Sequence, residues 1–169
     1  MPACLLDVNV WLAAAFAAHP AHGAARRVLH EASAQEPALW CRATQQSFLR
    51  LSSTPMITAA YGVAKSTNAD AWVALEAFLA LPQVDVIDEP HELDRHWRQL
   101  GGIEQSAPKR WMDAYLAAFA MAAGVLLVSL DRDFSHFEPE GLKVQLLLAD
   151  GSGDKAACTE PWSQLQPRI

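Results

Sequence analysis

The fold of this chain is decided by the stretch Val125-Leu126-Leu127-Val128-Ser129-Leu130-Asp131-Arg132-Asp133. Its first four residues form an unbroken β-branched and leucine run, which is typical of a strand in the middle of a parallel sheet. Two acids, Asp131 and Asp133, follow directly after that run. Because ligands of open parallel sheets bind beyond the carboxyl ends of the strands, both carboxylates are candidate site residues.

The same pattern occurs near the first residue, where Cys4-Leu5-Leu6 is followed directly by Asp7. Apolar residues at helical or alternating spacing divide the rest of the sequence into helices and strands. We expect helices over 8–18, 23–34, 44–51, 68–79, 91–100 and 108–123, and further strands over 39–41, 84–87 and 144–148. Strands that alternate with helices predict an α/β fold with a central, mostly parallel sheet flanked by helices.

Local signals mark the ends of several expected elements. Thr44 and Asn68 are side chains that cap helix N-termini, and Gly124 is expected to end the helix over 108–123. Residues 55–66 are expected to form a loop. The segment 149–169 holds two glycines and two prolines, and it is expected to be an irregular tail after one domain of residues 1–148.

Composition limits the class of protein. A chain of 169 residues that is 51% hydrophobic and 19% charged can bury a core, which excludes a disordered or fibrous chain. Its net charge of −6 leaves no broad basic face, so binding of nucleic acid would need a local patch or a bridging metal. No apolar run reaches the about 20 residues that cross a bilayer, so we expect no membrane span.

The cysteines and the first residues bear on the compartment. Three cysteines without close spacing, Cys4, Cys41 and Cys158, indicate neither a disulfide framework nor a zinc knuckle. The apolar run 8–18 has no basic residue before it, unlike a secretory signal peptide. We therefore expect a cytoplasmic protein.

A third carboxylate, Asp113, lies in the helix that precedes the strand at Val125. If the first turn of that helix reaches the strand ends, Asp113 meets Asp7, Asp131 and Asp133. Two such charges 4 Å apart repel by about 4 kcal/mol at an effective dielectric constant of about 20, so the site must hold protons or a cation. Ligands that are all oxygen favour Mg²⁺ or Mn²⁺, which serve in phosphodiester cleavage.

Each acid taken alone has another interpretation. Asp7 could cap the helix that follows it. Asp113 could pair with Lys109 or Arg110 at helical spacing. The sequence Asp131-Arg132-Asp133 could simply form a turn. Only the joint placement of the acids after two strands indicates a site.

Four blocks of sequence carry a resemblance to a known family. They are Leu5-Leu6-Asp7-Val8-Asn9-Val10-Trp11-Leu12, Cys41-Arg42-Ala43-Thr44-Gln45-Gln46-Ser47-Phe48-Leu49-Arg50, Met112-Asp113-Ala114-Tyr115-Leu116-Ala117-Ala118 and Leu127-Val128-Ser129-Leu130-Asp131-Arg132-Asp133-Phe134. In this order and at these separations they resemble the motifs of PIN-domain nucleases, most closely the VapC toxins of bacterial VapBC toxin–antitoxin pairs.

The resemblance implies a function and partners. It implies a PIN-like fold and a toxin with Mg²⁺- or Mn²⁺-dependent endoribonuclease activity, with tRNA as the expected RNA substrate. It also implies a VapB-like antitoxin as partner. An apolar groove around Trp11 and Leu12 is a candidate surface for that partner or for a homodimer.

The family's site residues can be carried over by position. The catalytic metal ligands would be Asp7, Asp113 and Asp131, with Asp133 beside them, Asn9 and Ser129 in support, and Arg50 as a contact for an RNA phosphate. The second motif departs from the family, which usually has Glu where this chain has Gln45. An amide supplies no charge and cannot act as a base, although its oxygen can still hold a water.

Two other functions remain open. Gln45 is compatible with a catalytically weakened PIN-fold module that binds RNA or a partner without cutting. The sequence Asp131-Arg132-Asp133 also fits the Asp-x-Asp of a haloacid-dehalogenase-like phosphatase, with Asp131 as nucleophile. In that fold the Asp-x-Asp normally opens the domain, whereas here only 36 residues follow Asp133. Activity assays separate the three functions.

Overall fold

The computed structural model describes residues 1–149, which form an α/β fold around a five-stranded parallel sheet. The strands are β1 (Cys4–Leu6), β2 (Ala38–Trp40), β3 (Val84–Val86), β4 (Leu126–Ser129) and β5 (Val144–Leu146). Their order across the sheet is β3-β2-β1-β4-β5, and each neighbouring pair is parallel. Beyond Ala149, the expected tail lies outside the described residues.

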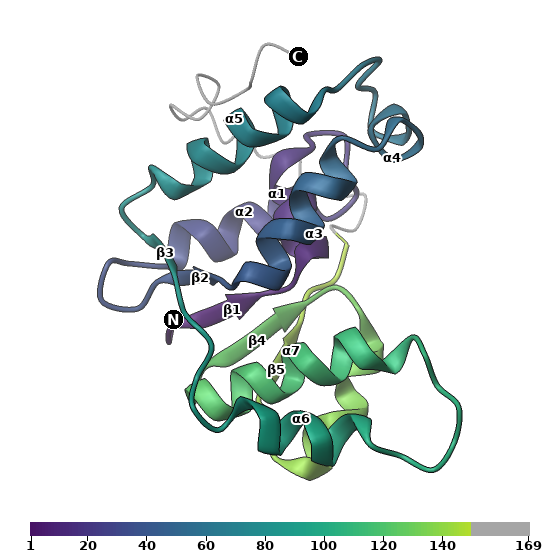
Figure 1. Cartoon of the computed structure of the whole chain (residues 1–169). Coiled ribbons are helices and arrows are strands. Elements are labelled where there is room, and N and C mark those ends of the chain that lie inside the picture. The colour runs from purple at the N-terminus through teal and green to yellow at the C-terminus, as the bar shows by residue number, and fades with distance from the viewer. Residues whose placement is uncertain (150–169) are drawn as a thin grey trace.

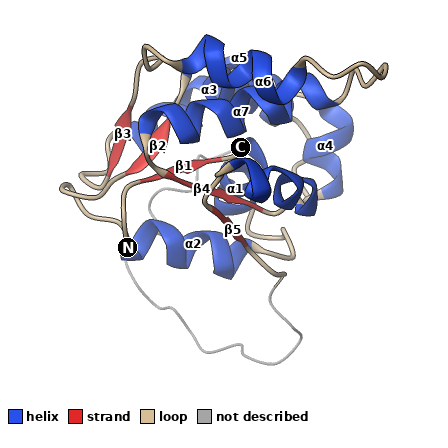
Figure 2. Ribbon diagram, turned by 90° about the horizontal axis from the view of Figure 1, so that it is seen from below, coloured by secondary structure: helices blue, strands red, loops and turns tan. Residues whose placement is uncertain are grey.

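Helices surround the short central strands (Figure 2). The α-helices are α1 (Val8–Ala15), α2 (His22–Glu31), α3 (Arg42–Ser52), α4 (Pro55–Ala60), α5 (Asn68–Leu79), α6 (Leu93–Gly101) and α7 (Arg110–Ala123), and a 3₁₀ helix, η1, spans Arg132–Glu140. None of these helices is both long and apolar enough to span a membrane.

The strands send alternate side chains to two separate cores. In β1, Cys4 and Leu6 face a core shared with α1, α2, α3 and α5, whereas Leu5 faces a core shared with α6, α7 and η1. In β4, Val128 and Leu127 divide in the same way. This period of two follows from the pleat of a strand, and Figure 1 shows the two helical layers on opposite sides of the sheet. A strand covered on both faces is apolar along most of its length, as the run at Val125 predicted.

Two tryptophans fill the first core. The rings of Trp11 and Trp40 stack at 3.8 Å between centroids and 8° between planes. Trp11 is 0% exposed and Leu12 is 8% exposed, so the expectation that they line a groove for a partner is wrong. The reason is that α5 covers α1, with Phe78 packed edge-on against Trp11 at 5.2 Å.

Three further local expectations change. Thr67, not Asn68, is the N-cap of α5, and its side chain accepts from the Asp70 N–H. Cys41, not Thr44, is the N-cap of α3, and Thr44 stands at the third helical position, where its Oγ1 accepts from the Cys41 N–H at 3.1 Å. Residues 55–66 are not all loop, since Pro55 opens the short helix α4 at a first-turn position. Gly124 ends α7 as expected, in the left-handed region at φ 68°.

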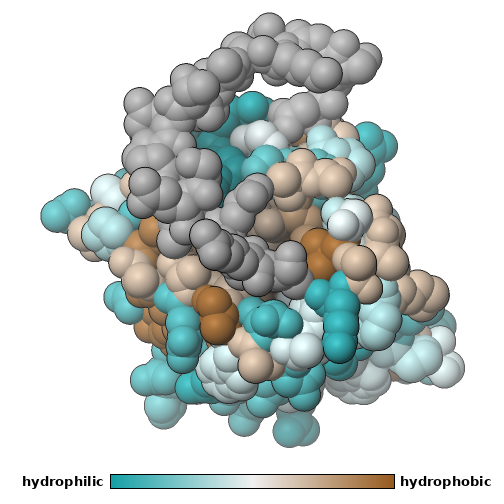
Figure 3. Space-filling view, turned by 90° about the horizontal axis from the view of Figure 1, so that it is seen from above, coloured by the Kyte–Doolittle hydropathy of each residue, from teal (hydrophilic) through white to brown (hydrophobic). Residues whose placement is uncertain are grey.

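The exposed surface holds few large apolar side chains. On the face shown in Figure 3, the visible strongly hydrophobic residues form small separate patches among polar ones. The large hydrophobic residues with substantial exposure among the described residues are Met56, Trp72, Val73, Val86, Ile103, Trp111, Met112 and Leu148.

Candidate active site

The carboxyl ends of β1 and β4 lie next to each other because these two strands pair in parallel, with Leu6 opposite Val128. The pairing continues for one residue, since the Asp7 N–H donates to the Val128 carbonyl at 3.0 Å. In Figure 1 the first turn of α7 lies on the side of the molecule where both strands end. The topology therefore brings three separate segments of sequence to one edge of the sheet.

Asp7 is buried and held on both carboxylate oxygens. Only 6% of the residue is exposed. Its Oδ1 accepts from the Val8 N–H at 2.6 Å, so Asp7 does cap α1. Its Oδ2 accepts from Asn9 Nδ2 at 2.6 Å and from Ser129 Oγ at 2.7 Å. The cap and the candidate site are thus two uses of one side chain.

Asn9 and Ser129 tie this carboxylate to the segment after β4. Asn9 Nδ2 also donates to Ser129 Oγ at 3.1 Å, and Asn9 Oδ1 accepts from the Leu130 N–H at 3.1 Å. Ser129 Oγ in turn accepts from the Asp131 N–H at 2.9 Å. The network fixes the backbone that carries Asp131 relative to the buried carboxylate of Asp7.

Three carboxylates line one cavity of about 210 Å³ at this edge. The lining residues are Asp7, Val8, Asn9, Ala43, Thr44, Ser47, Met112, Asp113, Leu116 and Asp131. We call this space the acid cavity. Asp131 is exposed, and its Oδ1 caps η1 by accepting from the Asp133 N–H at 2.9 Å. Asp133 itself is not among the lining residues.

The acid cavity raises the proton affinity of Asp7. Burial, with smaller contributions from the nearby charges of Asp113 and Asp131, raises the pKa of Asp7 to about 6, although the hydrogen bonds from Ser129 and Val8 act to lower it. Because a raised carboxyl pKa measures the cost of the ionised form, the cavity would be stabilised by a cation.

Asp113 responds to the same neighbours. Its pKa is raised first by burial and then by the charges of Asp131 and Asp133, and Arg110 lowers it. Arg110 is nevertheless turned elsewhere, since its Nε donates to the Leu100 carbonyl at 2.9 Å and its guanidinium lies 4.6 Å from the centre of the Phe137 ring. Within residues 1–149 no ion pair links Asp113 to Arg110 or Lys109, so the pairing suggested by their spacing is absent.

The donor set fits a hard divalent cation. Within residues 1–149 no three His, Cys, Asp or Glu side chains are close enough to bind one ion together. Mg²⁺ does not require this, because it commonly keeps several waters and uses one or two carboxylates. Three carboxylates line a cavity of about 210 Å³, and the pKa values of two of them, Asp7 and Asp113, are raised. A site with only such oxygen ligands matches that chemistry.

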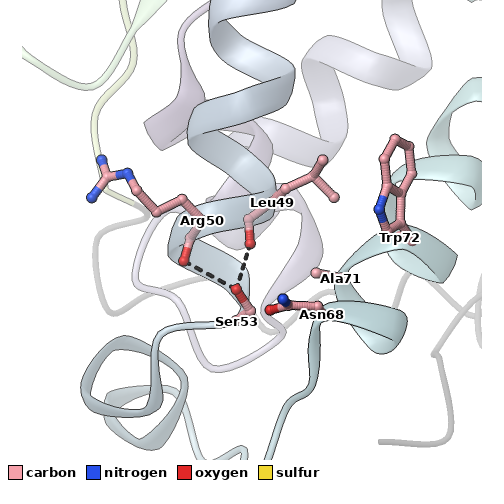
Figure 4. Close-up of a pocket in the computed structure, with 6 residues that line it drawn as sticks. All are labelled: Leu49, Arg50, Ser53, Asn68, Ala71 and Trp72. Carbon is pink, nitrogen blue, oxygen red and sulfur yellow. Dashed lines mark hydrogen bonds between the residues drawn. The ribbon is translucent and has the colours of Figure 1, made fainter.

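Four expected site residues are not among those that line the acid cavity: Asp133, Ser129, Gln45 and Arg50. Ser129 is buried and is linked to the cavity through its hydrogen bond to Asp7. Gln45 is buried, and its Oε1 accepts from Arg42 Nη1 at 2.7 Å. Arg50 is exposed and lines a second cavity of about 190 Å³ between α3 and α5. Figure 4 shows Arg50 and Trp72 on opposite sides of that second cavity.

The contribution of α3 to the acid cavity was missed by the sequence reasoning. It consists of Ala43, Thr44 and Ser47, with two hydroxyl groups in place of an amide. Ala43 and Ser47 are four residues apart and therefore share one face of the helix. That spacing could have identified Ser47 once Ala43 was known to face the site.

Comparison with known proteins bears on this arrangement. The sequence matches the PIN domain family over residues 4–138. The chain belongs to the PIN-domain family. This PIN domain is 42% identical over 144 residues to Ribonuclease VapC41 of two Mycobacterium tuberculosis strains, CDC 1551 / Oshkosh and ATCC 25618 / H37Rv. The alignment covers 85% of this chain and 97% of each relative, so the PIN domain is of the VapC type.

The PIN fold also recurs in a solved structure. It is "Crystal structure of VapBC2 from Rickettsia felis bound to a DNA fragment from their promoter", with a TM-score of 0.53 and 14% identity. The match covers 85% of this chain and 98% of that chain. At this identity the likeness supports the fold. The comparisons give the phosphatase hypothesis no support.

Proposed function

We propose that this VapC-type protein is the toxin of a type II toxin–antitoxin system and a Mg²⁺- or Mn²⁺-dependent endoribonuclease, with tRNA as its substrate class. One observation carries the proposal: Asp7, Asp113 and Asp131 line a single cavity at the strand ends of a PIN domain. The name of the Mycobacterium tuberculosis relatives, Ribonuclease VapC41, supports the reaction class.

Each carboxylate has a distinct part in this proposal. Asp7 offers a carboxylate whose position is fixed by Ser129 and Asn9, and Asp113 faces it from α7. Asp131, the exposed member, stands where an RNA phosphate would enter. The bound cation would lower the pKa of a water and offset charge on the phosphate during hydrolysis.

We further propose a VapB-like antitoxin as partner, a homodimeric assembly and a cytoplasmic location. The antitoxin proposal rests on membership of the VapC type. An arginine from the partner could neutralise the acid cavity, because a guanidinium matches the geometry of a carboxylate.

One observation favours a second function, a PIN module that binds without efficient cutting. The family's second motif usually supplies a glutamate where this chain has Gln45, and Gln45 is bonded to Arg42 instead of lining the acid cavity. The site would then have three carboxylates where the family usually has a further one, and it would bind a cation more weakly.

The test is cleavage of total tRNA by the purified protein in Mg²⁺ or Mn²⁺, with and without EDTA. We expect discrete fragments that disappear with EDTA and in Asp113→Asn. The matched control is Asp70→Asn. Asp70 is an exposed acid in the capping box of α5, and it does not line the acid cavity. Absence of wild-type cleavage in both metals would favour the binding module.

A further inference from the structure

An exposed indole stands on the first turn of α7, the turn that also carries Asp113. Trp111 is 52% exposed, and its neighbour Met112 is 49% exposed and lines the acid cavity. Successive residues of an α-helix point about 100° apart, so Trp111 and Asp113 face different sides of α7. Met112 lies between them in sequence, lines the acid cavity and is itself half-exposed.

The indole of Trp111 is held in place by α6. The ring of Trp97 meets it edge-to-face, at 6.2 Å between centroids and 86° between planes. The Trp97 Nε1–H donates to the Trp111 carbonyl at 3.1 Å. A Cβ added at Gly101 would lie 2.9 Å from the ring atom Cζ3, so the ring rests directly on the backbone of Gly101. Such a ring is preoriented and keeps half its surface for another flat group.

The segment that precedes this indole holds several basic side chains. Residues 95–110 include four basic side chains, Arg95, Arg98, Lys109 and Arg110, and one acidic side chain, Glu104. Arg98 and Lys109 are exposed. Arg95 lies 3.5 Å from Glu92, and Arg110 donates to the Leu100 carbonyl. The exposed Arg98 and Lys109 are therefore the basic side chains of this segment that a polyanion could contact.

We propose that Trp111 is a substrate-binding residue that stacks on an unpaired RNA base next to the cleaved phosphate, with Arg98 and Lys109 near the flanking phosphates. Single-stranded RNA is commonly held by bases stacked on aromatic rings within a basic surface. A protein partner would be matched equally well by the apolar ring, but the basic surroundings favour the polyanion. The inference rests on the proposed ribonuclease function.

The experiment measures binding apart from cleavage. Every variant carries Asp113→Asn to stop cutting, and the probe is a fluorescein-labelled single-stranded RNA of mixed sequence in Mg²⁺. Trp111→Ala is compared with Trp72→Ala, which removes an indole of almost equal exposure, 51%, from α5. Trp111→Phe restores a flat ring, and Gly101→Ala displaces the indole without removing it.

We expect Trp111→Ala to weaken RNA binding by about 5- to 100-fold, the range for loss of one stacked base, and Gly101→Ala to weaken it in the same direction. Trp111→Phe should retain most of the affinity, and Trp72→Ala should retain all of it. RNA should also quench tryptophan fluorescence, and the part of this quenching lost in Trp111→Ala reports direct stacking rather than a structural role.

Three outcomes would overturn the inference. The first is equal affinity of Trp111→Ala and Trp72→Ala for an RNA that the parent protein binds, which leaves the proposed ribonuclease intact. The second is unchanged RNA affinity together with a smaller solution mass of Trp111→Ala, which would make the indole a protein interface. The third is no RNA binding by the parent protein and no cleavage by the wild type, which removes the proposed function as well.

Discussion

The two walls of the acid cavity are built differently. The wall from β1 and β4 holds Asp7 buried, with hydrogen bonds to both carboxylate oxygens, and Ser129 links it to the backbone of Asp131. The wall from α7 presents Asp113 half-buried, and within residues 1–149 its side chain makes no hydrogen bond or ion pair that would hold it in one place. One wall is preorganised, and the other is left to be ordered by what binds.

In the wall from β1 and β4, the position of the Asp7 carboxylate is well fixed, but its negative charge is poorly stabilised. The hydrogen bonds to Asp7 stabilise its ionised form, whereas burial and the neighbouring acids destabilise it. The destabilising effects are larger, and the pKa of Asp7 therefore rises to about 6. The wall from β1 and β4 therefore combines fixed geometry with unfavourable charge, which is the combination expected of residues that bind a cation.

The largest effect should come from removing the carboxylate of the rigid wall. We expect Asp7→Asn to lower tRNA cleavage more than about 100-fold, because even hydrogen-bond partners of metal ligands contribute about 10- to 100-fold. Initial rates at equal Mg²⁺ measure it, with circular dichroism to confirm that the variant folds. Asp133→Asn, which changes an acid outside the cavity lining, should lose less. Full activity of Asp7→Asn would contradict the assignment.

A smaller loss of cleavage rate should follow when the Ser129 hydroxyl, which supports the position of Asp7, is removed. Ser129→Ala deletes the hydroxyl that donates to Asp7 and accepts from the Asp131 N–H, so we expect cleavage to fall about 10- to 100-fold. The control is Ser53→Ala, whose hydroxyl bonds the Leu49 carbonyl on α3. If both serine variants cut at the wild-type rate, the rigid wall does not depend on Ser129.

The wall from α7 should affect the thermal stability of the folded protein, because Asp113 adds a charge close to the buried Asp7. A raised folded-state pKa means that folding takes up protons, so the contribution of Asp7 is complete below pH 3.8 and lost as the pH rises through about 6. In EDTA, Asp113→Asn removes one of the opposing charges and should raise the melting temperature at pH 8 by about 2–4 °C for each 1 kcal/mol of relief. The gain should shrink at pH 4.

Added Mg²⁺ provides the check on that prediction. The ion should raise the melting temperature of the wild type at pH 8, because a ligand bound only by the folded state stabilises it. It should do less for Asp113→Asn. Equal responses of both proteins to Mg²⁺ would show that Asp113 takes no part in holding the ion.

The smallest effect is expected at Gln45. Because its side chain accepts from Arg42 outside the acid cavity, Gln45→Glu should form an ion pair there instead of adding a fourth carboxylate. We expect a rate change within about threefold, the size of a weak ion pair. A large gain in rate would mean that position 45 reaches the cavity during catalysis. Combining Gln45→Glu with Arg42→Ala then tests whether Arg42 holds it back.

The sequence was informative where a pattern has a single physical outcome. The short β-branched and leucine run at Val125 was typical of a strand covered on both faces, and acids that follow two neighbouring parallel strands share one edge of the sheet. The helix at Pro55 was missed because six residues are too few for a periodic pattern.

Side-chain direction was the part that the sequence could not supply. Gln45 and Ser47 are two residues apart on α3, and the choice of which one faces the acid cavity depends on how α3 packs against α1 and α5. The burial of Trp11 depends in the same way on α5, which comes more than fifty residues later in the chain. Local spacing does not determine either orientation.

The stacked pair of Trp11 and Trp40 gives this protein an optical marker of its own fold. Two parallel indoles at 3.8 Å are close enough for their electronic transitions to couple, which would produce a paired signal in the near-ultraviolet circular dichroism. Trp11 lies on α1, the helix that Asp7 caps, so movement of that helix would alter the coupling. The protein can therefore report events at its carboxylates without any attached label.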